Sequence, residues 1–171
     1  MNIRAGGPAD AGPATELFSR ADAARDGRPF EAASPEAIQG LHARLCDPDA
    51  RLLLGYEGAE LIATAMSTPA RRDGGTGDLI PAAAHVSLIG VAPEYWGRGY
   101  GRTILQELTK WLRSAGLERL SLSVVAANTR ARRLYERCGW QVDGPPAPHP
   151  NHPDLLMQAY ALDLSATNRP A

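Results

Sequence analysis

Residues 97–102 combine three glycines with two arginines, and this is the stretch best suited to bind a ligand. An apolar run ending at Val91 precedes it and an amphipathic run follows. Without Cβ atoms, successive backbone N–H groups can turn toward one point, and a helix N-terminus adds unpaired amides and the positive end of its dipole. The planar donor forks of Arg98 and Arg102 suit phosphate oxygens. The stretch therefore predicts a site for the pyrophosphate of a phosphorylated cofactor.

Two common phosphate-binding motifs do not fit this loop. The loop of nucleotide hydrolases ends in Lys followed by Ser or Thr, whereas Arg102-Thr103 stands here without a lysine. A dinucleotide fingerprint reads Gly-x-Gly-x-x-Gly, but the third glycine of this chain comes one residue early and no early first strand precedes the loop. A different class of phosphorylated cofactor is therefore expected.

A second motif, Asn128-Thr129-Arg130-Ala131-Arg132-Arg133-Leu134-Tyr135, follows the loop by about thirty residues. Together with Val91-Ala92-Pro93 and Arg98-Gly99-Tyr100-Gly101, it resembles the GCN5-related N-acetyltransferase (GNAT) family. The resemblance is close over residues 83–142 and covers the flanks in outline. The family usually has Gln or Arg where this chain has Trp96.

The resemblance implies a single N-acetyltransferase domain over residues 1–171, with its core cofactor-binding motif at 83–142. Acetyl-CoA is then the acyl donor, and a primary amine, favoured here as a small molecule, attacks it directly in a ternary complex. The alternatives are an amine of a peptide or protein, and a non-catalytic domain that senses acyl-CoA. The expected cofactor-binding residues are Ile89, Gly90, Val91, Gly97, Arg98, Gly99, Tyr100, Gly101, Arg102, Asn128 and Tyr135.

Gly90 has two interpretations within its apolar strand. A glycine weakens the ladder and often marks a bulge, which would leave a backbone N–H near Ile89–Val91 to stabilise the oxyanion of an acyl transfer. The glycine equally fits a position where a helix packs closely above the strand. The residues alone do not separate the two interpretations, and the family resemblance favours the bulge.

Tyr135 is the candidate general acid, because a phenol is protonated at neutral pH and can donate to a departing thiolate. Its spacing from Ala131 also fits a tyrosine packed in the core, and the resemblance favours the catalytic role. Asn128 fits a helix cap as well as a cofactor contact. Both roles can coexist if its backbone caps the helix while its side-chain amide meets the pantetheine arm.

His85 is the candidate general base. Strand alternation places it on the same face as Ser87 and Ile89, and imidazole titrates nearer to neutral pH than other side chains. Some family members carry a glutamate base at this strand position, and others carry it on the following strand, where this chain has Ser123. The alternatives are an ordinary strand histidine at position 85 and, as a weaker contender, Glu94.

The elements that position these residues are marked by prolines and glycines between periodic segments. Strands are expected at 2–5, 51–56, 60–66, 82–91, 120–125, 140–142 and 154–164, and helices at 8–25, 35–46, 98–114 and 128–138. A helix joins 82–91 to 120–125, which makes these strands parallel neighbours. The expected fold is α/β, with a GNAT-type mixed, mostly antiparallel central sheet, a splayed parallel strand pair and about four flanking helices.

Residues 144–153 contain so many prolines that we expect an irregular loop, long enough to overhang a cleft as a substrate lid. His149, His152 and Asp154 have a spacing open to a metal ion, but a loop without helical or strand support makes a poor tetrahedral site. No metal is predicted. Contacts with the acceptor amine, or a plain solvated loop, fit these residues better.

Composition narrows the class of protein. A length of 171 residues with 44% hydrophobic residues fits one domain, and 18 basic against 19 acidic residues argue against binding to nucleic acid. No run approaches the length of about 20 apolar residues that spans a bilayer, and no secretory leader is apparent. We expect a cytoplasmic monomer or homodimer that binds no membrane, with Cys46 and Cys138 as buried thiols.

Overall fold

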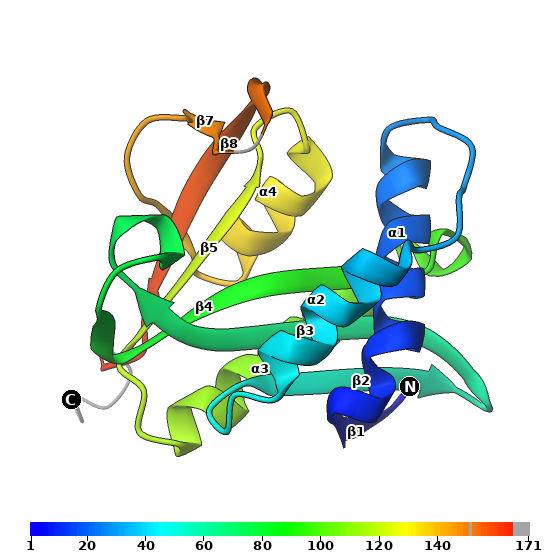
Figure 1. Ribbon diagram of the computed structural model, residues 1–171, viewed down its shortest axis with the longest axis horizontal. Helices are drawn as coiled ribbons and strands as arrows, with labels where there is room; N and C mark the ends of the chain where they lie inside the picture. The colour runs from blue at the N-terminus through cyan, green and yellow to red at the C-terminus, as the bar shows by residue number, and fades with distance from the viewer. Residues whose placement is uncertain (151, 166–171) are drawn as a thin grey trace. The chain divides into compact units, whose positions relative to one another are not determined.

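The computed structural model describes residues 1–150 and 152–165 (Figure 1). Its helices are α1 (Ala11–Arg25), α2 (Pro35–Leu45), α3 (Tyr100–Ser114) and α4 (Thr129–Arg137). Its strands are β1 (Asn2–Gly6), β2 (Arg51–Glu57), β3 (Glu60–Arg71), β4 (Leu79–Val91), β5 (Arg119–Val125), β6 (Gln141–Val142), β7 (Ala147–His149) and β8 (His152–Asp163). Short 3₁₀ turns occupy Pro8–Asp10, Asp73–Gly75 and Pro93–Tyr95.

The strands pair in the order β1-β2-β3-β4-β5-β8-β6, with β7 beside β8. β1 with β2, β2 with β3, and β8 with β5, β6 and β7 are antiparallel pairs, whereas β4 and β5 are parallel. The parallel register joins Ala83–Val86 to Arg119–Leu122, and both strands continue beyond the last pair. The predicted α/β fold, with a mixed, mostly antiparallel sheet and a parallel pair between these strands, is confirmed.

The described residues divide into two compact units. Unit 1 holds residues 1–68 and 87–110, and unit 2 holds the remaining described residues. The expectation of one domain over the whole chain stays a prediction.

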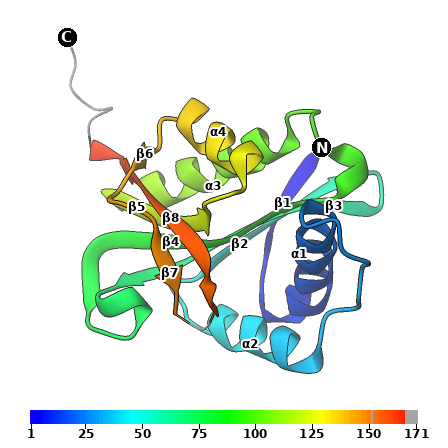
Figure 2. The same ribbon diagram turned by 90° about the horizontal axis from the view of Figure 1, so that it is seen from above.

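Unit 1 is built on strands that carry helices on both faces. α1 and α2 lie on one side of β2 and β3, and α3 lies on the other (Figure 2). Ser34 caps α2 just before Pro35, and its Oγ accepts a hydrogen bond from the Ala37 amide at 3.2 Å. One apolar cluster fills the α1 and α2 side of these strands. Each large side chain that is fully buried there stabilises the fold by about 1.5–3 kcal/mol. The cluster contains Ala11, Ala14, Leu41, Leu45, Leu52, Leu54, Met66 and Leu88.

Unit 2 centres on the long antiparallel pair of β5 and β8, with α4 beside it (Figure 1). Alternate residues of β5 are buried, namely Leu120, Leu122 and Val124. Tyr160 of β8 is fully buried, and its hydroxyl donates to Glu136 Oε1 at 2.8 Å and accepts from Arg132 Nε at 3.1 Å. Both partners belong to α4, so this buried hydroxyl fixes the helix to the sheet.

Residues 144–153 differ from the irregular loop that we expected. Ala147–His149 form β7, which pairs antiparallel with β8, and β8 itself begins at His152. Pro148 is compatible with this arrangement because a strand that pairs on one side only can turn the missing N–H away from its partner. The described residues of this segment therefore lie largely in two paired strands.

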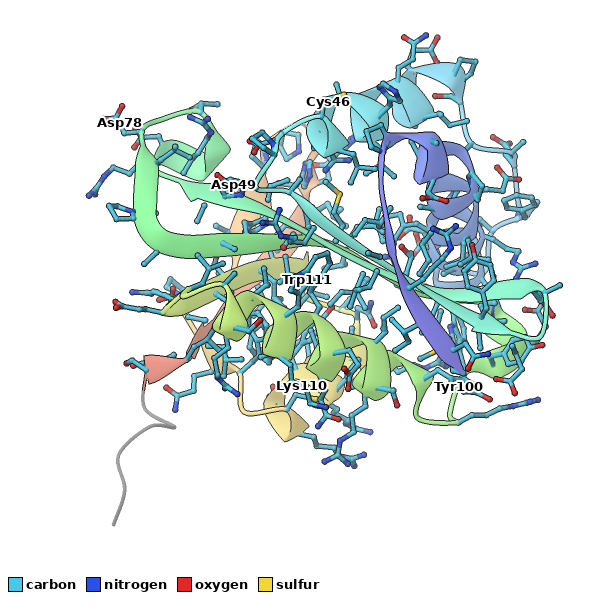
Figure 3. The ribbon with its side chains drawn as sticks, turned by 90° about the horizontal axis from the view of Figure 1, so that it is seen from below. Cys46, Asp49, Asp78, Tyr100, Lys110 and Trp111 are labelled. Carbon is cyan, nitrogen blue, oxygen red and sulfur yellow. The ribbon has the colours of Figure 1, made fainter. Side chains whose placement is uncertain are left out.

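The environment of one cysteine was also mispredicted. Cys46 is exposed just after the end of α2 (Figure 3), whereas Cys138 is half-buried, and the two form no disulfide in the described part of the chain. The apolar face of α2 consists of Leu41 and Leu45 with Ile38 packed beside them, so the position of Cys46 falls outside it. Among the helices within the described residues, none combines the length and apolar character needed to cross a bilayer.

Candidate functional site

The glycine-rich loop lies in unit 1, between β4 and α3. Gly97 and Gly99 have φ angles of 78° and 87°, values that residues with a Cβ rarely adopt. A Cβ built at either glycine would meet no atom within 4 Å, so the backbone of the loop is open on that side. The Thr103 amide bonds to the Gly99 carbonyl at 3.0 Å, and the amides before it belong to the helix start, where no intrahelical partner exists. These features fit a pyrophosphate.

Trp96 occupies the position that departs from the family pattern. Its indole N–H donates to the Val91 carbonyl at 2.7 Å, which ties the beginning of the loop to the end of β4. The side chain at this position therefore stabilises the turn. Contacts with a phosphate stay predicted for the backbone and for the neighbouring arginines.

The two arginines of the loop differ in their surroundings. The Arg98 guanidinium lies 5.1 Å from the centre of the Tyr95 ring, within the range of a cation–π contact. Arg102 is exposed in the first turn of α3, and Tyr100 and Gly101 open that helix. Gly101 stays a predicted cofactor contact through its backbone amide.

Gly90 lies directly against α1. A Cβ at this position would stand 3.0 Å from Leu17 Cδ2 and 3.4 Å from the Phe18 Cα. The close approach of the helix thus accounts for the glycine, as the second interpretation held. The positive φ within β4 belongs instead to Ala82, at 52°. An oxyanion donor among Ile89, Gly90 and Val91 stays a prediction.

Tyr135 is buried on α4 in unit 2. Its ring lies 6.2 Å from that of Trp140 and 5.8 Å from that of Tyr160, measured between centroids. Burial raises the pKa of its hydroxyl well above the ordinary tyrosine value, because the phenolate would lose its hydration. The phenol therefore stays protonated at neutral pH, as a proton donor must.

This pKa shift predicts a loss of stability in alkali. The folded chain keeps the Tyr135 proton while the unfolded chain releases it above a pH of about 10, so the unfolded state gains free energy as the pH rises. The contribution is complete below that pH and declines by about 1.4 kcal/mol per pH unit above it. In urea unfolding at increasing pH, Tyr135→Phe should show a shallower decline than the parent protein, and equal slopes would contradict the shift.

His85 lies on β4 in unit 2, beside the parallel strand β5. Its Nδ1 is 3.0 Å from Ser121 Oγ, and Ser121 is also its partner in the strand register. When Nδ1 carries the ring proton it donates to this hydroxyl, and Nε2 is then the basic nitrogen. Sequence reasoning missed Ser121, although its alternation with Leu120 and Leu122 marks it as a residue of the opposite face.

His85 and Tyr135 approach β5 from opposite faces. His85 contacts the side chain of Ser121, whereas Tyr160, against which Tyr135 packs, pairs with Leu122. Consecutive strand residues point to opposite faces, so the two candidate groups are separated by the sheet. The register of β4 with β5 ends at Leu122, one residue beyond Ser121.

Asn128 caps α4 through its backbone and through its side chain. Its carbonyl accepts a hydrogen bond from the Arg132 amide at 3.1 Å. Its Oδ1 accepts from the Ala131 amide at 3.1 Å. The cap uses Oδ1 and does not need the side-chain NH₂ group. This NH₂ group is the part of Asn128 that stays predicted to contact a pantetheine arm.

His149 and His152 are register partners in the β7–β8 hairpin, with ring centroids 5.2 Å apart. Asp154 lies further along β8 and is exposed. Within residues 1–150 and 152–165, no three His, Cys, Asp or Glu side chains gather as a group that could hold a metal ion.

Known proteins share the fold of this chain, and part of its sequence matches one protein family. Residues 16–140, more than half of the chain, match the acetyltransferase (GNAT) family. The ribosomal-protein-S18-alanine N-acetyltransferase of Escherichia coli superposes with a TM-score of 0.72 at 20% identity, covering 95% of this chain and 93% of that one. The structure of yncA, a putative acetyltransferase from Salmonella typhimurium with its cofactor acetyl-CoA, gives a TM-score of 0.72 at 20% identity over 100% of this chain and 98% of its own.

Closer identity is confined to short segments. The uncharacterized N-acetyltransferase YycN of Bacillus subtilis is 44% identical over 52 residues, which is 30% of this chain and 33% of that protein. A mycothiol acetyltransferase of Thermobispora bispora is 46% identical over 61 residues, or 34% of this chain and 21% of that protein. The chain spans a third or less of the length of these curated relatives.

The fold and the family match together define the class of protein, and the chain belongs to the acetyltransferase (GNAT) family. The solved structures at this low identity support the fold alone.

Proposed function

We propose that this protein is an N-acetyltransferase that uses acetyl-CoA to acetylate a primary amine. The observation that carries the proposal is the open loop before α3, where Gly97 and Gly99 have positive φ angles and no atom lies within 4 Å of a built Cβ. In a chain of this family, such a loop is suited to the pyrophosphate of the cofactor. Residues 1–171 would then work as one acetyltransferase domain.

When bound, acetyl-CoA supplies the thioester whose acetyl group is transferred. His85 Nε2 accepts the proton that the attacking amine loses, and Ser121 holds the ring through Nδ1. Tyr135, whose phenol is protonated at neutral pH, donates its proton to the leaving thiolate on the other face of β5. The last register pair, Val86 with Leu122, lies next to His85 and contains the strand partner of Tyr160, so we assign the shared reaction to this end of the pair.

The acceptor in this proposal is a small-molecule amine. The chain has no run of acidic residues to receive a basic protein tail, and its net charge is −1. An amine of a peptide or protein is the alternative acceptor. Assays of a panel of small amines and of peptide amines, compared by kcat/KM, distinguish the two.

Calorimetry with acetyl-CoA tests the binding part of the proposal. The parent protein should bind with a Kd in the micromolar to millimolar range typical of enzyme substrates, with a matching rise in Tm. Gly99→Val should weaken binding by about tenfold or more, because a β-branched residue is strained at that φ and its Cβ enters the open side of the loop.

Gly116→Val is the matched control for this experiment. Gly116 has a φ of 83° and open space around a built Cβ, but it follows α3 at the end away from the loop. This variant should carry similar strain and keep the affinity of the parent. An absence of heat and of thermal shift at millimolar acetyl-CoA in the parent would contradict the proposal.

A further inference from the structure

Two tyrosines at the ends of the phosphate loop are bound to one hairpin of unit 1. The Tyr95 hydroxyl donates to Glu60 Oε2 at 2.8 Å, and the Tyr100 hydroxyl donates to Glu57 Oε2 at 3.2 Å. Glu57 ends β2 and Glu60 begins β3, so both carboxylates belong to the turn of the same hairpin. Figure 3 shows Tyr100 where the loop enters α3. The turn Trp96–Gly99 is thereby held at both ends.

Contacts between the aromatic rings extend this support to Arg98. The Tyr95 and Tyr100 rings meet edge to face with centroids 5.9 Å apart, and the Arg98 guanidinium lies 5.1 Å from the centre of the Tyr95 ring. A chain of contacts thus runs from Glu60 through Tyr95 to Arg98. A guanidinium packed on a fixed ring loses less rotamer freedom when it binds an anion than one that extends freely into water.

The negative charge of Glu57 and Glu60 bears on how the nearby loop binds an anion. A negative group beside a pyrophosphate site opposes the binding of the anion, and exposed charges at this range are only partly screened by salt. Glu57 Oε2 also lies 3.3 Å from the Met1 ammonium, which offsets its charge, whereas the charge of Glu60 alone would weaken binding. A favourable contribution of Glu60 must then come from the hydroxyl that it holds.

We propose that Glu60 and Glu57 are positioning residues for the cofactor, which fix the phosphate loop and Arg98 through the hydroxyls of Tyr95 and Tyr100. This inference rests on the proposed function, because it assumes that the loop binds the pyrophosphate of acetyl-CoA. It assigns a role in cofactor affinity to a hairpin that lies outside both sequence motifs.

Replacement of Glu60 in two ways separates its charge from its hydrogen bond. Glu60→Ala removes both, and acetyl-CoA binding measured by calorimetry should weaken by about 3–10-fold, because the loss of an anchoring hydrogen bond exceeds the gain from removing an exposed charge. Glu60→Gln keeps an acceptor for the Tyr95 hydroxyl and removes the charge. Its affinity should equal or exceed that of the parent.

A double-mutant cycle links the effect to Tyr95. Tyr95→Phe keeps the ring under Arg98 but removes the hydroxyl, so it should weaken binding by about the same factor as Glu60→Ala, and the double variant should be no weaker than either one. Glu107→Ala serves as the control, because Glu107 is an exposed carboxylate of α3 paired with Lys110. It should bind as the parent does.

The outcomes separate this inference from the proposed function. A parent protein that binds no acetyl-CoA contradicts the proposed function. A parent that binds, with Glu60→Ala binding as tightly or more tightly, overturns the positioning role and leaves the proposed function standing. Additive effects in the double variant would also overturn it. The hydroxyl of Tyr95 is removed from a surface loop, so Tyr95→Phe tests the inference even if Glu60→Ala folds poorly.

Discussion

Tyr135→Phe is expected to lower the turnover number by about 10²–10⁴-fold, the usual contribution of a positioned general acid, with little change in acetyl-CoA affinity. The phenylalanine ring preserves the packing on Trp140 and Tyr160, so the variant loses the proton donor and almost nothing else. Steady-state kinetics with an accepted amine, paired with calorimetry of cofactor binding, measures the two quantities separately.

Tyr160→Phe is the control for this experiment. It removes the neighbouring hydroxyl, whose partners are Glu136 and Arg132, and keeps an aromatic ring against Tyr135. A loss of stability of about 1–3 kcal/mol is expected from the buried partners left unpaired, with turnover largely retained.

Unchanged turnover in Tyr135→Phe would remove the acid role. If the parent binds acetyl-CoA but acetylates no amine, the acyl-CoA-sensing alternative becomes the better explanation.

His85→Ala is expected to lower activity at neutral pH by about 10²–10⁴-fold and to recover part of it as the pH rises. Without the imidazole, the acceptor amine must lose its proton to solvent before it attacks, and a more alkaline medium supplies more of the neutral amine. A profile of kcat/KM against pH for the parent and the variant measures this difference.

Ser121→Ala tests the positioning of the same ring. It removes the oxygen that lies 3.0 Å from His85 Nδ1 and leaves the imidazole in place. A smaller loss than in His85→Ala is expected, without the recovery at high pH. Full activity of His85→Ala at neutral pH would return His85 to the role of an ordinary strand histidine.

Local signals of the sequence were sufficient for most of the fold. Ser34 before Pro35 marked the start of α2, and Asn128 marked the start of α4, because these caps act within one turn of the chain. The crossover from β4 through α3 to β5 followed from the spacing of the elements, since a helix between two strands makes a parallel pair. The glycine pattern likewise identified the loop before α3.

Features that depend on strand register or on distant partners escaped prediction. The contact of His85 with Ser121 requires the register of two strands that are far apart in sequence, and alternation alone does not set it. The bonds of Tyr95 and Tyr100 to the β2–β3 hairpin are of the same kind. β7 was missed because the prolines argued against a strand, although an edge strand tolerates them.

Because His85 and Tyr135 lie on opposite faces of β5, the proposed reaction would take up a proton on one face of the sheet and release one on the other. Each turnover would leave one extra proton on the imidazole side of the sheet and one proton missing on the phenol side. A new turnover can begin only after solvent has removed the extra proton from His85 and has returned a proton to Tyr135. Because the Tyr135 ring is buried against Trp140 and Tyr160, we expect solvent to restore its proton only after the free thiol has left.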